Sequence, residues 1–183
     1  MATGIWQASQ NPVTTAIALF SSARRNGNTG ALMDRIAGQL GIEVVDLGTL
    51  KIAPYDYEHS HRDDDFAPLM LRVLEYDRVI FASPVYCYAV APPMKAFFDR
   101  ITDFLDLPDL QNEARRLRGK AAYVVCTSIY DKAPPSFLGA FHDNFEYFGM
   151  RFGGVAHANC ADGYDPARHD PIALAFAASL RGP

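Results

Sequence analysis

Cysteine is scarce in this sequence. Its three cysteines, Cys87, Cys126 and Cys160, lie far apart, so no C-x-x-C pair is present. The absence of that spacing excludes the common zinc, iron–sulfur and thioredoxin-type sites, which depend on closely spaced thiols. An odd number of cysteines without a signal-peptide pattern is typical of a reducing compartment, so we expect a cytoplasmic protein.

Long apolar runs and an excess of basic residues are also missing. No stretch approaches the roughly 20 apolar residues of a membrane-spanning helix, so we expect no membrane partner. The net charge of −4 argues against nucleic acid as the main partner, because a nucleic-acid-binding face needs clustered Lys and Arg. The length of 183 residues suits one domain with a buried core. We assign residues 14–183 to that domain and residues 1–13, which include Trp6, to an N-terminal extension.

Short apolar segments alternate with amphipathic ones along the domain. The segments with strand character are 14–21, 42–47, 78–82, 121–126 and 151–158. The segments with helical periodicity are 31–40, 66–76, 92–105, 135–148 and 172–180. This alternation predicts an α/β sandwich with a parallel sheet, because right-handed crossovers place helices on both faces. The phenylalanine stripe of 137–148 is assigned to the core.

The segment 20–30 connects the first predicted strand to the first predicted helix and is rich in polar side chains. A helix begins with backbone N–H groups that lack partners and with the positive end of its dipole, which together suit a phosphate. Ser22, Arg24, Asn28 and Thr29 are the candidate donors to such a group. The alternative is that Ser22, Asn28 and Thr29 only cap the helix.

Two further polar loops follow predicted strands, at residues 83–86 and 127–130. In an open parallel sheet, ligands bind outside the carboxyl ends of the strands, where the strand order reverses. We therefore expect the three polar loops to converge on one crevice.

Other residues that could bind a metal or react are assigned structural or solvent-exposed roles. The His- and Asp-rich run 58–65 invites a metal interpretation, but two histidines in an acidic loop are more often solvated, and no metal is assigned. Lys95, Asp99 and Arg100 are taken as structural, with Lys95 and Asp99 at ion-pair spacing on a helix. Cys87 is taken as a small buried filler. His142 and His157 receive no role.

Two motifs in this order resemble those of the flavodoxin-like NAD(P)H-dependent FMN reductases. Residues 21–29, Ser-Ser-Ala-Arg-Arg-Asn-Gly-Asn-Thr, resemble the family's G-S-x-R-x-x-G-N-T phosphate loop. The run Ser-Pro-Val-Tyr at 83–86, with Lys95 and Asp99-Arg100 beyond it, is similar to the second signature, an S/T-P-x-Y loop followed by K-x-x-x-D-R. The resemblance covers about residues 14–158. Ser21 replaces the family's first glycine, and 127–130 lacks the glycine common there.

The resemblance implies a three-layer flavodoxin-like sandwich with a five-stranded parallel sheet in the order 2-1-3-4-5. It implies an FMN cofactor, NAD(P)H as co-substrate and a homodimer. The implied cofactor-binding residues are Ser22, Arg24, Asn28 and Thr29 at the phosphate, and Pro84, Val85, Tyr86, Cys87, Ser128 and Tyr130 around the flavin ring. Backbone N–H groups of 84–87 are expected at the pyrimidine edge, with Tyr86 or Tyr88 beside the ring.

The implied reaction carries hydride from NAD(P)H through the flavin to a small acceptor, which could be a flavin, a quinone, an azo or nitro compound, or a metal ion. No side chain needs to act as an acid or base, so no catalytic residue is assigned. One alternative is a flavodoxin-type electron carrier, although such carriers are usually more acidic than −4. Another is a regulatory or scaffold domain that keeps the fold without the flavin.

Overall fold

A computed structural model describes residues 16–181, and the predicted extension 1–13 with Trp6 lies outside them. Its centre is a five-stranded sheet in which all neighbouring strands run parallel. The strands are β1 (Ala16–Phe20), β2 (Glu43–Asp46), β3 (Arg78–Ala82), β4 (Ala121–Ser128) and β5 (Arg151–Asn159). Their order is β2-β1-β3-β4-β5, which confirms the predicted flavodoxin-like topology.

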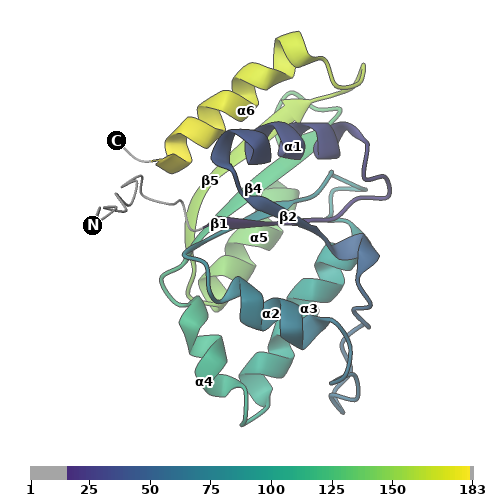
Figure 1. Cartoon of the computed structure of the whole chain (residues 1–183). Helices are drawn as coiled ribbons and strands as arrows, with labels where there is room; N and C mark the ends of the chain where they lie inside the picture. The colour runs from purple at the N-terminus through teal and green to yellow at the C-terminus, as the bar shows by residue number, and fades with distance from the viewer. Residues whose placement is uncertain (1–15, 182–183) are drawn as a thin grey trace, which may run out of the picture.

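Helices cover both faces of this sheet. They are α1 (Asn28–Leu40), α2 (Phe66–Val73), α3 (Pro92–Asp106), α4 (Gln111–Ala114), α5 (Pro135–Tyr147) and α6 (Pro166–Arg181), with short 3₁₀ turns η1 (Leu47–Thr49) and η2 (Arg115–Leu117). Figure 1 shows α1 and α6 on one face, with α2, α3 and α5 on the other. None of the helices in the described part of the chain has the length and apolar character to cross a membrane.

Each face of the sheet has its own apolar core. Side chains of a strand point alternately to opposite faces, so Ile17 and Leu19 pack toward α2, α3 and α5, while Ala18 and Phe20 pack toward α1 and α6. The phenylalanine stripe of α5 is buried in the first core, as predicted for 137–148. Strands buried on both faces explain the continuous apolar runs of the sequence.

Several element boundaries differ from the sequence prediction. Helix α1 begins at Asn28 instead of residue 31. Helix α6 begins at Pro166, before the predicted start at residue 172, and Pro171 lies inside it. Strand β4 extends to Ser128, because its last residues still pair with β5. Helix α4 was not predicted; four residues are too few for a periodic signal.

The acidic run 58–65 is not simply solvated, which corrects the expectation from sequence. Arg100, 2% exposed, donates hydrogen bonds from Nε to Asp103 at 2.6 Å and from Nη1 to Asp64 at 2.5 Å. His59 Nδ1 lies 2.8 Å from Asp103 Oδ1. Burial alone would raise the pKa of Asp64, but hydrogen bonds from Arg100 and two backbone N–H groups hold it below its usual range. The structural assignment of Arg100 is confirmed.

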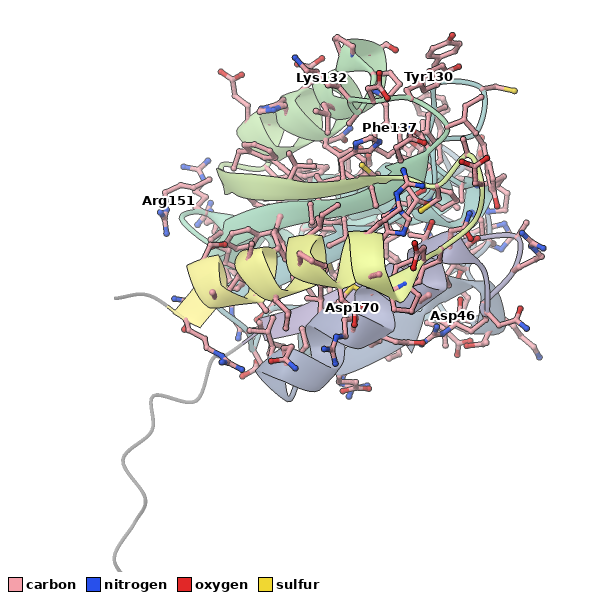
Figure 2. The ribbon with its side chains drawn as sticks, turned by 90° about the horizontal axis from the view of Figure 1, so that it is seen from above. Asp46, Tyr130, Lys132, Phe137, Arg151 and Asp170 are labelled. Atoms are coloured by element: carbon pink, nitrogen blue, oxygen red, sulfur yellow. The ribbon has the colours of Figure 1, made fainter. Side chains whose placement is uncertain are left out.

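The carboxyl ends of the strands lie together at one end of the molecule. In Figure 2, Asp46 at the end of β2 and Tyr130 after β4 lie at this end, while Arg151 at the start of β5 lies at the opposite end. The polar loops that follow β1, β3 and β4 therefore share one edge of the sheet.

Candidate functional site

Helix α1 presents unpaired backbone donors at its start. Its N-cap is Gly27, which makes no side-chain capping hydrogen bond. The first backbone hydrogen bond of α1 runs from the N–H of Ala31 to the carbonyl of Gly27, at 2.9 Å. The three N–H groups before Ala31 therefore have no partner within the helix, and they point along its positive end. This arrangement suits an anion.

The side chains of Asn28 and Thr29 fasten α1 to the sheet instead of capping it. Asn28 Nδ2 donates to the carbonyl of Cys160, just after β5, at 3.3 Å. Thr29 Oγ1 lies 2.6 Å from Thr127 Oγ1, a buried hydrogen bond to the end of β4. These bonds fix the helix start relative to both strand ends.

A close backbone contact also fixes the loop between β1 and α1 (residues 21–27). A Cβ on Gly30 would lie 1.9 Å from the carbonyl oxygen of Arg25, so only glycine allows this packing. Ser21 does not have a positive φ, so the turn at the position of the family's first glycine does not require one. Ser21 is buried, and its Oγ has no hydrogen-bond partner in the described structure.

Tyr86 joins the β1–α1 loop to the loop between β3 and α3 (residues 83–91). Its hydroxyl lies 3.2 Å from Ser22 Oγ and accepts a hydrogen bond from the N–H of Ala23 at 3.3 Å. Two of the three polar loops are thus connected through one phenol group.

The backbone of the β3–α3 loop offers fewer free donors than predicted. The N–H of Val85 donates to the carbonyl of Thr127 at 3.1 Å, and the N–H of Tyr86 donates to Ala89 at 2.9 Å. The expectation that these two N–H groups remain free for a ligand is therefore wrong. In the described structure, Cys87 is the residue of 84–87 whose N–H has no partner. Its side chain is exposed, which also corrects its assignment as a buried filler.

The loop after β4 (residues 129–134) is supported by a histidine that the sequence analysis left without a role. His157 Nε2, on β5, lies 2.8 Å from Ser128 Oγ, which in turn accepts the N–H of Tyr130 at 3.1 Å. Burial lowers the pKa of His157, so the neutral ring is favoured. The parallel register pairs His157 with Cys126, two residues before Ser128, and this neighbourhood is not visible without the strand pairing.

All three loops open onto one cavity of about 460 Å³. Every predicted cofactor-binding residue lines it: Ser22, Arg24, Asn28, Thr29, Pro84, Val85, Tyr86, Cys87, Ser128 and Tyr130. The further lining residues are Gly27, Tyr88, Thr127, Ile129 and Cys160. Of these, Cys160 was missed because its place depends on where β5 ends. The cavity size falls within the usual range of small-molecule sites.

Comparison with known proteins identifies the family. The family model for NADPH-dependent FMN reductases matches residues 14–179. The chain belongs to this family. It is an oxidoreductase enzyme of the FMN- and NAD(P)H-dependent kind, as its motifs predicted.

Individual relatives of this FMN reductase family member agree with the assignment. The chain is 27% identical over 140 residues, 72% of its length and 77% of the other's, to YwqN of Bacillus subtilis (strain 168), named as an NAD(P)H-dependent FMN-containing oxidoreductase. The structure of Trp repressor binding protein from Bacillus subtilis superposes with a TM-score of 0.72 at 22% identity, covering 91% of this chain and 98% of that one. The structure of an FMN-dependent NADH-azoreductase from Bacillus anthracis, in complex with FMN, superposes with a TM-score of 0.66 at 10% identity. The match covers 91% of this chain and 98% of that one. The two structural likenesses concern the fold.

The donor set of the cavity fits the family's cofactor. The start of α1 supplies free N–H groups, Ser22 supplies a hydroxyl, and Arg24 is a cation whose side chain makes no hydrogen bond or ion pair in the described structure. No carboxylate among the described residues lines the cavity, so nothing there repels a phosphate. Aromatic and aliphatic side chains of the other two loops provide the apolar wall that a flavin ring needs.

Proposed function

We propose that FMN binds in this cavity, with its phosphate at the start of α1 and its ring between the β3–α3 loop and the end of β4. The observation that carries the proposal is the convergence of a free helix N-terminus, an unpaired Arg24 and an apolar wall on one cavity of about 460 Å³. A charge-assisted hydrogen bond from Arg24 to the phosphate would add to the backbone donors. Tyr86 would hold the phosphate loop and the ring wall in register.

The proposed activity is the transfer of electrons from NAD(P)H to a small acceptor, a flavin, a quinone, an azo or nitro compound, or a metal ion. FMN bound here would supply the two-electron chemistry that connects NAD(P)H to the acceptor. With a quinone, the overall reaction consumes NAD(P)H, a proton and the quinone, and yields NAD(P)⁺ and the hydroquinone. The chain's own residues bind and orient the cofactor, and no catalytic acid or base is assigned.

The visible spectrum of the purified protein tests cofactor binding. Flavin absorption that is lost on denaturation, with a released compound that matches FMN in chromatography, would support the proposal. A colourless protein that also fails to take up added FMN would contradict it. Steady-state oxidation of NAD(P)H with a quinone then separates the enzyme from the electron carrier, since a carrier binds FMN without such turnover.

The proposal also treats residues 14–183 as one domain that forms a homodimer. We propose that this dimer acts in a reducing cytoplasm. The free thiols of Cys87, Cys126 and Cys160 are compatible with that compartment. Exposed Tyr147 and Phe152 provide apolar surface for a subunit contact. Light scattering tests the assembly, because a dimer has twice the chain mass of 20.2 kDa.

A further inference from the structure

Two tyrosine rings stack on each other at the edge of the cavity. Tyr88, from the β3–α3 loop, and Tyr130, from the β4–α5 loop, have ring centroids 5.6 Å apart and ring planes at 21°. Both line the cavity, yet they remain 56% and 37% exposed. Figure 2 shows Tyr130 projecting outward at the carboxyl end of the sheet. Partly exposed aromatic rings beside a cavity can receive another flat ring by stacking.

The backbone that carries Tyr88 is in an uncommon conformation. Cys87 and Tyr88 have φ angles of 47° and 63°, and the flanking Tyr86 and Ala89 exchange two backbone hydrogen bonds of 2.9 Å. Consecutive left-handed residues in a two-residue turn usually call for Asn-Gly. Strained conformations of other residues cluster at ligand sites. Tyr88 therefore places a large aromatic side chain at a position where the backbone conformation favours glycine.

The chemistry around the two rings favours one class of acceptor. Arg24 is the charged side chain among the described residues that line the cavity, and no carboxylate lines it. Metal cations need several closely placed carboxylate, imidazole or thiolate ligands, and the described residues contain no group of three such side chains that could hold one. Ile129, 67% exposed, and Val85 add apolar surface instead.

We propose that the Tyr88–Tyr130 pair is the platform on which the electron acceptor docks, and that this acceptor carries a flat conjugated ring. The inference rests on the proposed function and narrows its acceptors to quinone-like and other planar aromatic compounds, excluding metal ions. The acceptor ring stacks on the exposed tyrosine faces, so the pair determines acceptor affinity and does not take part in electron transfer.

Calorimetric titration with 1,4-naphthoquinone tests this platform without turnover. Tyr88→Asn removes the ring while tolerating the left-handed backbone, and Tyr88→Phe keeps the ring. We expect naphthoquinone to bind about fivefold more weakly to Tyr88→Asn and equally well to Tyr88→Phe. The matched control is Tyr57→Ala, which breaks the exposed Tyr55–Tyr57 ring contact outside the cavity and should leave binding unchanged. Equal binding by all variants would overturn the platform.

Steady-state kinetics gives a second test. Tyr88→Asn should raise the KM for naphthoquinone about fivefold relative to the KM for ferricyanide, which has no ring to stack, when both are measured on protein of matched FMN content. Tyr130→Ala should have the same effect and serves if the first variant does not fold. Equal losses with both acceptors, or a rise in KM for NAD(P)H alone, would overturn the platform. A wild-type protein without FMN or turnover would contradict the proposed function instead, and the titration would still decide the role of the tyrosines.

Discussion

Asp34 binds the guanidinium of Arg25, with Nη1 donating to Oδ2 at 3.0 Å. The same guanidinium lies 4.9 Å from the centre of the Phe20 ring. The side chain of the adjacent Arg24 has neither kind of partner in the described structure and lines the cavity. Two neighbouring arginines of one loop are therefore not equivalent, because one is already neutralised and the other is available to an anion.

Arg24→Ala should weaken FMN binding about 10- to 100-fold, the range for loss of one charge-assisted hydrogen bond. Riboflavin, which lacks the phosphate, should bind almost as before. Fluorescence titration of both ligands measures the two affinities. Arg25→Ala is the matched control and should change FMN affinity little. Equal losses for FMN and riboflavin would mean that Arg24 does not contact the phosphate.

Gly30→Ala should lower the free energy of unfolding by about 1–3 kcal/mol, because the new methyl group would overlap the carbonyl of Arg25. Gly38→Ala, in the same helix with nothing within 4 Å, should raise it by up to about 1 kcal/mol. Urea unfolding of both variants gives these differences. A stable Gly30→Ala protein would show that the loop carbonyl moves away at little cost.

The half-buried His157 should make the protein less stable in mild acid. Burial lowers its folded-state pKa below 6.5, so the unfolded chain binds a proton at a higher pH than the folded protein does. Stability is therefore lost as the pH falls from about 6.5 through the lowered pKa. His157→Gln should lose less stability than wild type between about pH 7 and pH 5. Parallel pH curves from chemical denaturation would contradict this.

Arg100→Met should cost about 3–5 kcal/mol of stability, because it leaves Asp64 and Asp103 without their buried partner. Lys95→Met breaks the exposed pair with Asp99 on the same helix and should cost less than about 1 kcal/mol. Thermal unfolding compares the two variants. Similar shifts in Tm would contradict the buried network as a source of stability.

Much of the fold was predictable because its signals are local. Apolar runs such as that of β1 and periodic stripes such as that of α5 follow from burial, and they were located correctly. Element boundaries that depend on pairing with a distant strand were not predicted correctly. Residues 127 and 128 have polar side chains, and they belong to the strand because they pair with β5.

The candidate site shows the same division. The residue types and loops of the cavity could be predicted, because strand ends and polar sequence mark them. The hydrogen-bond partner of each backbone N–H could not be predicted from the sequence. The bonds from the N–H groups of Val85 and Tyr86 to backbone carbonyls were therefore missed. His157 was also missed, since its role depends on strand register, which the sequence does not display.

The strand order has a consequence for local opening of the molecule. The three cavity loops follow β1, β3 and β4, and each of these strands is hydrogen-bonded to a neighbour on both sides. Such strands exchange their amide hydrogens only when much of the molecule opens, whereas an edge strand opens more easily. Detachment of the four-residue β2 would leave the three loops attached to β1, β3 and β4, which stay paired with one another. The protein can therefore loosen at that edge while a ligand stays bound at its centre.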